Sequence, residues 1–253
     1  MSATYPYQLD PHDLSADTYS LPTVSPLYTP PPFEYRDGWS QLVIFKSDPA
    51  ILARYVPKPL VVDPEGIMTM TISKFFTSGF GAYNESVLTT NVSFNGAPAN
   101  YSLFLILDSD IATGGGREIW GWPKKIGRVG LSTRDGMVTG TVERGGVQLV
   151  QATMALTSLV PASAMAGGSL DFINLKLIPS VKTGAPPEVR QLTKCAMSNF
   201  VPKQIFRGNA TLTFGASPAD RFNVFPIREI VDAFYYNSDF TLGDGDVVYD
   251  YLK

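Results

Sequence analysis

The chain lacks most of the residues on which common catalytic and structural sites depend. It has one cysteine, Cys195, so no disulfide can form within the chain, which fits a reducing compartment. Its one histidine, His12, lies in a proline-rich leader, which argues against Ser-His-Asp catalysis, Cys-His catalysis and most metal sites. The chain contains neither a Gly-Lys-Ser/Thr motif nor a Gly-x-Gly-x-x-Gly motif, the usual phosphate and dinucleotide loops. Any chemistry must therefore come from lysine, glutamate, arginine and tyrosine.

Charge and hydropathy exclude further classes of protein. The net charge of −3 and the pI of about 5.2 lack the basic excess of a nucleic-acid binder. No run approaches the roughly 20 apolar residues that a membrane helix needs, and the N-terminus has no signal-peptide core. We therefore expect a cytoplasmic protein that binds neither nucleic acid nor membranes and uses no metal and no cofactor.

The abundant residues indicate a β-rich fold. Aromatic residues make up 12% of the chain, and 22 glycines and 20 prolines supply many turns. We predict a proline-rich arm over residues 1–32 and one mainly β (β-rich α+β) domain over 33–253, a closed or nearly closed antiparallel barrel or cone with few helices. Expected strands cover 42–45, 67–76, 87–94, 101–107, 129–133, 137–143, 171–177, 192–205, 209–214 and 247–251. Asp135-Gly136 and Gly145-Gly146 predict two hairpin turns.

Three segments carry other expectations. Asp48 followed by Pro49 predicts a short capped helix. Ile227, Ile230, Val231 and Phe234 recur at a spacing that predicts a second helix. Residues 108–121 are predicted to be a glycine-rich loop.

That loop leads to a lysine pair, Lys124-Lys125, flanked by Trp120, Trp122, Pro123 and Ile126. An ordinary lysine has a pKa near 10.4, so about one in 2,500 is neutral at pH 7, and only a neutral amine attacks a carbonyl. Apolar burial and a neighbouring cation both favour the neutral amine. If the pair is extended, its side chains point to opposite faces, only one enters a pocket, and burial has the larger effect. A lysine pair is more often solvated surface, so this spacing alone does not establish catalysis.

Longer strings around the pair resemble a known family. Gly116-Arg117-Glu118-Ile119-Trp120-Gly121-Trp122-Pro123-Lys124-Lys125-Ile126-Gly127 is similar to the signature of the acetoacetate decarboxylase family. The segment from Thr77 to Ser86 resembles that family's Gly-x-Gly-x-Tyr-x-Glu segment, and 92–96 and 248–253 are also similar. The resemblance extends from about Phe33 to the end and implies an acetoacetate decarboxylase-like fold and a homo-oligomer.

The resemblance implies roles for individual residues. Lys124 matches the lysine that forms a Schiff base with a ketone, and Lys125 matches the second lysine that assists it. Glu85 matches an active-site acid, and Arg36 matches an arginine that orients the substrate carboxylate. We predict Lys124, Glu85 and Lys125 to be catalytic. Arg117 and Glu118 are expected to form a buried ion pair that shapes the loop.

The substrate-binding set holds one departure from the family. The family's decarboxylases carry a second acid nine positions before the residue that matches Gly79, and Met70 stands there in this chain. We expect Arg36, Met70, Trp122 and Tyr251 to contact substrate, with Met70 making the pocket more apolar.

Three functions follow. The preferred one is decarboxylation of acetoacetate or a related β-keto acid through an imine on Lys124. The second is a Schiff-base aldolase or dehydratase that joins a 2-oxo acid such as pyruvate to an aldehyde, with Tyr249 or Tyr251 as a candidate base. The third is a barrel that binds a small ligand without turnover.

Overall fold

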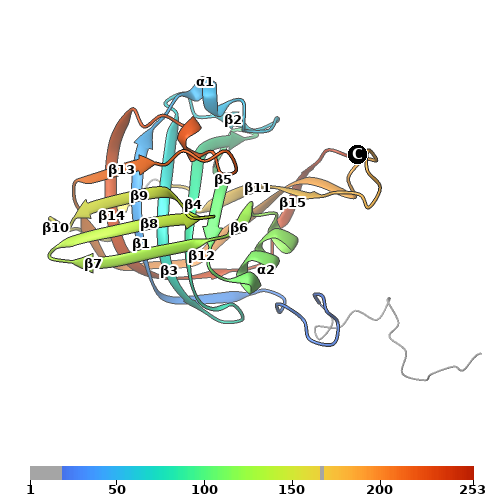
Figure 1. Cartoon of the computed structure of the whole chain (residues 1–253), viewed down its shortest axis with the longest axis horizontal. Coiled ribbons are helices and arrows are strands. Elements are labelled where there is room, and N and C mark those ends of the chain that lie inside the picture. Colours follow the sequence, from blue (N-terminus) through green and yellow to red (C-terminus); the bar gives the residue numbers. More distant parts are fainter. Residues whose placement is uncertain (1–18, 166–167) are drawn as a thin grey trace, which may run out of the picture.

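The structure is a computed structural model, and it describes residues 19–165 and 168–253 (Figure 1). Its strands are β1 (Phe33–Lys46), β2 (Val61–Val62), β3 (Ile67–Thr77), β4 (Gly81–Phe94), β5 (Ala97–Leu107), β6 (Lys124–Ile126), β7 (Arg128–Arg134), β8 (Met137–Arg144), β9 (Val147–Ala155), β10 (Ser158–Leu159), β11 (Asp171–Ile178), β12 (Val189–Arg207), β13 (Ala210–Phe214), β14 (Glu229–Leu242) and β15 (Asp246–Asp250). The α-helices are α1 (Pro49–Leu52) and α2 (Asp110–Trp120), and the 3₁₀ helices are η2 (Ala162–Met165) and η3 (Phe222–Val224).

The large sheet curls until it nearly closes on itself. Its strand order is β2-β4-β3-β1-β14-β12-β11-β5-β6, and β5 also pairs with β4, so the pairings run round as a ring. Closure depends on a short parallel pairing of β11 with β5, at Phe172 with Asn100 and Ile173 with Tyr101. The predicted nearly closed β-rich cone is therefore confirmed, although β5 pairs in parallel with both β11 and β6.

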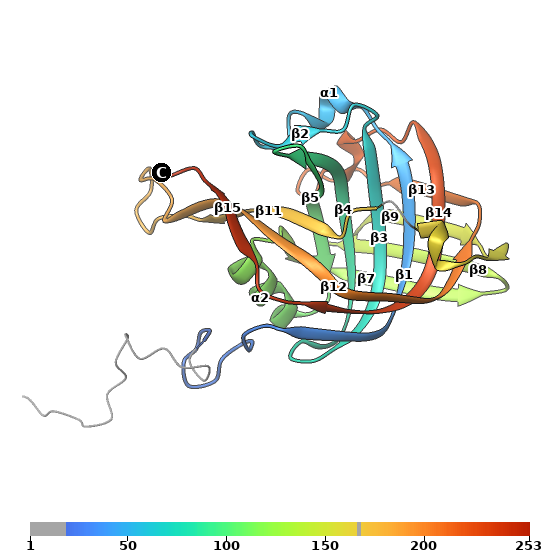
Figure 2. The same ribbon diagram turned by 180° about the vertical axis from the view of Figure 1, so that it is seen from behind.

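A second sheet covers one face of the first. This four-stranded sheet, in the order β13-β9-β8-β7, crosses in front of β1, β3 and β4 in Figure 1, and the curled sheet is seen from behind in Figure 2. The main core fills the space between the sheets, with Val43, Met68 and Ile72 on one side and Val138 and Leu149 on the other. The other, concave face of the large sheet is left to line a cavity.

Both predicted hairpin turns are confirmed, as is the short helix. Asp135 and Gly136 join β7 to β8 with φ values of 50° and 75°, and Gly145 and Gly146 join β8 to β9 with φ values of 60° and 76°. Two successive residues with positive φ are what a tight hairpin turn between twisted strands requires. The Asp48 carboxylate caps α1, whose first residue is Pro49.

Two predictions about secondary structure were wrong. The expected helix near Phe234 is strand β14, which pairs with β1 and β12 and buries Ala233, Phe234, Tyr235 and Tyr236 in succession. A strand buried on both faces loses its polar–apolar alternation, so apolar spacing could not distinguish it from a helix.

The expected glycine-rich loop over 108–121 is mostly helix α2. The Ser109 side chain accepts a hydrogen bond from the Ala112 amide at its start, and Gly121 ends it at a φ of 73°. Glycine inside a helix costs about 1 kcal/mol relative to alanine, which is why the sequence favoured a loop. Close packing explains these glycines, since a Cβ on Gly114 would lie 2.7 Å from Leu27 and one on Gly115 would lie 2.9 Å from Phe80.

Both ends of the described part of the chain extend from the curled sheet. Residues 1–18 of the predicted arm lie outside the described part, and the chain from residue 19 runs through turns to β1, with Tyr28 buried beside α2. The division between arm and domain at residue 32 remains a prediction. The hairpin of β11 and β12 projects with the C-terminus beside it (Figure 1, Figure 2). Among the described residues, no helix has both the length and the apolar character that crossing a membrane requires.

Candidate active site

Lys124 is the first residue of β6 and points into the concave side of the large sheet. Its side chain is 6% exposed, and its Nζ lies 2.7 Å from Glu85 Oε2 in β4. The two residues are brought together because β6 pairs with β5 at Leu105, and β5 pairs with β4 at Glu85. Two of the three residues predicted to be catalytic, Lys124 and Glu85, therefore meet in one buried contact.

Helix α2 makes room for this lysine and holds its backbone. A Cβ on Gly116 would lie 2.5 Å from both Cδ and Cε of Lys124, so only glycine fits beside the lysine stem without a shift. Arg117 Nη1 donates to the Lys124 carbonyl oxygen at 3.1 Å. Glu118 accepts a hydrogen bond from the Tyr28 hydroxyl and does not pair with Arg117. Arg117 and Glu118 are both exposed. The expected buried Arg117–Glu118 pair was therefore wrong.

Two tyrosines stand next to the amine. The Tyr83 ring centroid lies 5.8 Å from Lys124 Nζ, and the hydroxyls of Tyr35 and Tyr83 are 3.0 Å apart. Burial, followed by nearby charge, raises the pKa of both tyrosines well above the usual value. Burial also raises the pKa of the Cys195 thiol to about 12. The tyrosines are thus neutral hydroxyls and the cysteine a neutral thiol at pH 7.

The walls around the amine are aromatic and aliphatic. The cavity has a volume of about 840 Å³. Near Lys124 its lining includes Phe75, Phe80, Trp122, Phe172, Phe240 and Leu242. In the described part of the chain, Lys124 is the only lysine or arginine that lines it. Trp122, which was predicted to contact substrate, is 9% exposed and lies in this wall.

Lys125 faces the opposite side of β6, as an extended pair requires. Its Nζ lies 2.7 Å from Asp220 Oδ1, and Arg144 Nη1 lies 2.8 Å from Asp220 Oδ2. Lys125, which was predicted to be catalytic, does not line the cavity, and its charge is paired with a buried aspartate on the other side of the strand. The Lys125–Asp220–Arg144 cluster anchors β6 to the β8 strand and to the segment before η3.

Three residues predicted to contact substrate lie outside the cavity lining. Arg36 is half exposed, lies outside the cavity lining and pairs with Glu34 at 3.0 Å. Met70 is 1% exposed but lies in the core between the two sheets, because β3 turns its even-numbered residues away from the cavity. The Tyr251 hydroxyl donates to the Lys58 carbonyl oxygen, and Tyr249 is 42% exposed, so neither lines the cavity.

The structure adds cavity residues that sequence reasoning missed. Ser73 lies directly across from Glu85 in the β3–β4 pairing, and its hydroxyl is 2.8 Å from that of Ser40. Thr69 and Thr71 continue the same face of β3. The signal was present in the sequence, since Met68-Thr69-Met70-Thr71-Ile72-Ser73 alternates strictly between apolar and hydroxyl residues.

A buried amine paired with a carboxylate, inside an apolar cavity, defines a class of site that presents lysine to a small carbonyl compound. The family model described as "Acetoacetate decarboxylase (ADC)" matches residues 20–252. The acetoacetate decarboxylase of Ralstonia nicotianae is 33% identical over 238 residues, covering 92% of this chain and 95% of the relative. That of Burkholderia multivorans is 33% identical over 245 residues, covering 95% and 98%.

Solved structures agree in fold. One described as acetoacetate decarboxylase has a TM-score of 0.87 at 28% identity and covers 92% of this chain and 96% of its own. The enduracididine biosynthesis enzyme MppR complexed with pyruvate has a TM-score of 0.81 at 18% identity, covering 94% and 100%, a likeness of fold alone. The chain belongs to the acetoacetate decarboxylase family.

Asp220 generates a prediction about stability and pH. Burial alone would raise its pKa, but hydrogen bonds from Lys125 and Arg144 outweigh burial and lower the pKa below the usual value. Because the folded pKa is depressed, the stabilisation is present above the unfolded value of about 3.9 and is lost as pH falls through the folded value. We expect Asp220→Asn to lower the free energy of unfolding at pH 7 by about 1–3 kcal/mol, since Lys125 and Arg144 are partly exposed and screened.

Urea unfolding of both proteins between neutral pH and the acid limit measures this difference. The difference in the free energy of unfolding between wild type and Asp220→Asn should narrow as pH falls below about 4. Asp135→Asn is the matched control, because Asp135 pairs with Arg134 where both side chains are almost fully exposed. A gap that stays constant with pH would show that the Asp220 charge does not stabilise the fold.

Proposed function

We propose that this protein decarboxylates acetoacetate or a related β-keto acid through an imine on Lys124. The observation that carries the proposal is the 2.7 Å contact between Lys124 Nζ and Glu85 Oε2 in a cavity whose lining includes many aromatic and aliphatic side chains. The named relatives at 33% identity support the choice of β-keto acid.

The chemistry uses the amine as a nucleophile and then as an electron sink. Lys124 Nζ, after giving its proton to Glu85, attacks the ketone carbon, and loss of water gives a protonated imine. The bond to the carboxylate carbon breaks, its electron pair moves toward the imine nitrogen, and CO₂ leaves with an enamine remaining. Protonation of the enamine carbon and hydrolysis by water then release the ketone and the free amine. Glu85 is placed to move protons to and from nitrogen in these steps.

The walls of the cavity favour the loss of the carboxylate. An arginine bound to it would stabilise the ground state, and only interactions that are stronger in the transition state accelerate a reaction. Arg36 lies outside the lining, and aromatic side chains such as Phe75 and Phe240 surround the space near the amine. A carboxylate that becomes neutral CO₂ loses its charge in this apolar setting, so the step gains from poor solvation of the ground state.

The imine has a direct test. Borohydride added with acetoacetate should reduce the imine and add a stable mass to the wild-type chain on Lys124, and Lys124→Ala should show neither adduct nor CO₂ release. Lys125→Met is the matched control. It removes the neighbouring amine, which lies outside the cavity, so this variant should still form the adduct. An adduct that persists in Lys124→Ala, or none in the wild type, would falsify the proposal.

The same experiment separates the other functions. An adduct with pyruvate and product only when an aldehyde is added would indicate an aldolase or dehydratase. Saturable binding of keto acids without any adduct would indicate a ligand-binding protein.

Glu85→Gln keeps the shape of the side chain but removes the proton acceptor. We expect kcat for CO₂ release to fall by about 10²–10⁴-fold, the usual effect of losing a general acid or base. Glu65→Gln is the control, since Glu65 pairs with Lys46 at the surface and should leave kcat unchanged. A kcat for Glu85→Gln within about threefold of wild type would assign the proton transfers to another group.

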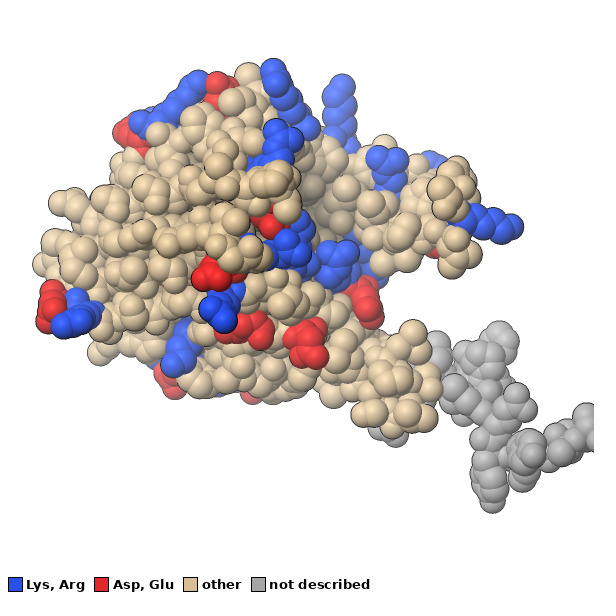
Figure 3. Space-filling model, viewed as in Figure 1, with Lys and Arg blue, Asp and Glu red and all other residues tan. Residues whose placement is uncertain are grey.

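We propose also that the chain acts in the cytoplasm as a homo-oligomer. The projecting hairpin of β11 and β12 exposes apolar side chains, with Val181 98% and Leu177 49% exposed. On the face in Figure 3, charged side chains are sparse over the four-stranded sheet, so a second copy could cover it without burying many charges. Light scattering should give a mass of at least two chains, each of 27.5 kDa. A single species of 27.5 kDa at micromolar concentration would contradict the assembly.

A further inference from the structure

The cavity extends well beyond the space that acetoacetate can fill. Its volume of about 840 Å³ lies in the upper part of the range of roughly 300–1,000 Å³ typical of pockets for drug-sized ligands. Acetoacetate has only four carbons, and the imine fixes its ketone carbon at Lys124. Most of the cavity would then remain outside the reach of the substrate.

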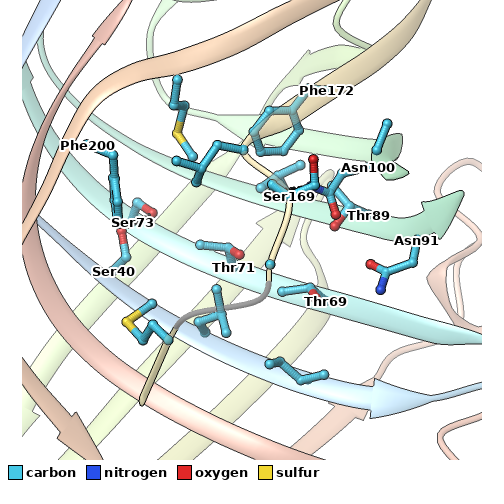
Figure 4. A pocket seen from close by; sticks show the side chains of 18 of the residues that line it. Ser40, Thr69, Thr71, Ser73, Thr89, Asn91, Asn100, Ser169, Phe172 and Phe200 are labelled. Carbon is cyan, nitrogen blue, oxygen red and sulfur yellow. Dashed lines mark hydrogen bonds between the residues drawn. The ribbon is translucent and has the colours of Figure 1, made fainter. Parts of the chain in front are cut away.

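The remaining space follows rows of paired residues away from Lys124. In the β3–β4 pairing, Ser73 faces Glu85, Thr71 faces Val87 and Thr69 faces Thr89. Each row lies two residues further along the strand, and at about 3.3 Å per residue the third row is roughly 13 Å from Glu85. Figure 4 shows Ser73, Thr71 and Thr69 in succession along one strand, with Thr89 and Asn91 on the neighbouring strand.

Hydroxyl groups in the second and third rows lack partners. The Ser40 and Ser73 hydroxyls bond to each other at 2.8 Å, so the first row is satisfied. Within the described residues, the hydroxyls of Thr69, Thr71 and Thr89 make no hydrogen bond to the protein, although all three residues line the cavity. Polar groups in a partly buried wall normally bond to water or to a ligand, because leaving them unpaired is costly.

The same rows present aliphatic carbon between the hydroxyls. Leu42 pairs with Thr71, and Ile44 pairs with Thr69, and both line the cavity. Besides Glu85, two carboxylates line the cavity, but Asp232 bonds to Arg207 and Asp63 accepts from the Glu65 amide. This wall has no cation to bind an anion, so it fits a neutral chain with carbon along its length and hydroxyls at intervals.

We infer that the substrate is a β-keto acid whose ketone carries a long, neutral, hydroxyl-bearing chain, and that Thr71, Thr69 and Thr89 bind that chain. The inference rests on the imine chemistry proposed above. Acetoacetate shares the reacting group but leaves the second and third rows empty.

Three acids test the inference on the wild-type protein: acetoacetate, 3-oxodecanoate, and 3-oxodecanoate with a hydroxyl on C8. We expect kcat/KM for the hydroxylated acid to exceed that for acetoacetate by at least about tenfold and to exceed that for plain 3-oxodecanoate. If acetoacetate is the best of the three, the long-chain substrate is excluded. If the two long acids are equal, the hydroxyl part of the inference fails.

Variants identify the wall that binds the chain. Thr71→Val keeps the shape and removes the hydroxyl, and it should lower the ratio of kcat/KM for the hydroxylated acid to that for plain 3-oxodecanoate by about 3–10-fold. The double variant Thr69→Val/Thr89→Val tests the third row, roughly 13 Å from Glu85, by the same ratio measured with 3-oxopentadecanoate and with that acid hydroxylated on C13. Thr133→Val is the matched control, because Thr133 is an exposed strand residue outside the cavity, and its ratio should equal that of wild type. A ratio in both cavity variants equal to that of the control would overturn the inference.

Borohydride trapping with each acid separates this inference from the proposed function. If acetoacetate forms the Lys124 adduct and releases CO₂ while both long acids do neither, the imine chemistry holds and the long-chain inference fails. If none of the three acids forms an adduct, the proposed function fails and this inference fails with it.

Discussion

The contact between Lys124 and Glu85 is the constraint on which the rest of the site depends. A lysine amine and a carboxylate are both costly to bury alone, and at 2.7 Å each offsets much of the cost of burying the other. Holding them together requires β6, β5 and β4 to lie side by side, and it requires Gly116 to leave space for the lysine stem. The pairing of β4, β5 and β6 in the large sheet and Gly116 in α2 therefore position this buried pair.

The two faces of β6 have different tasks. Lys124 enters the cavity, whereas Lys125 points to the other side, where Asp220 and Arg144 hold it. A strand alternates its side chains, so two adjacent lysines cannot share one pocket. This geometry keeps the Lys124 amine in the cavity and the Lys125 ammonium on the other side of the strand. The second lysine stabilises the strand from behind.

Local sequence signals predicted the structure correctly at positions where the backbone preferences of a few residues decide it. The turn at Asp135-Gly136 and the cap at Asp48 follow from backbone preferences of a few residues, and both are confirmed. The same approach failed for α2 and for β14. Packing outweighs the poor helix propensity of three glycines in α2, and burial on both faces hides the alternation of β14.

The sequence by itself contains the lysine motif, identifies the family and shows the alternation of apolar and hydroxyl residues along β3. The tertiary structure decided which face of each strand lines the cavity. In β3 the apolar face, with Met70, packs on the second sheet, and the hydroxyl face, with Thr71, lines the cavity. In β1, Tyr35 lines the cavity and Arg36 does not, whereas Tyr251 lies in the turn after β15. Alternation separates two faces of a strand, but only the packing of one sheet on another determines which face is core and which is site.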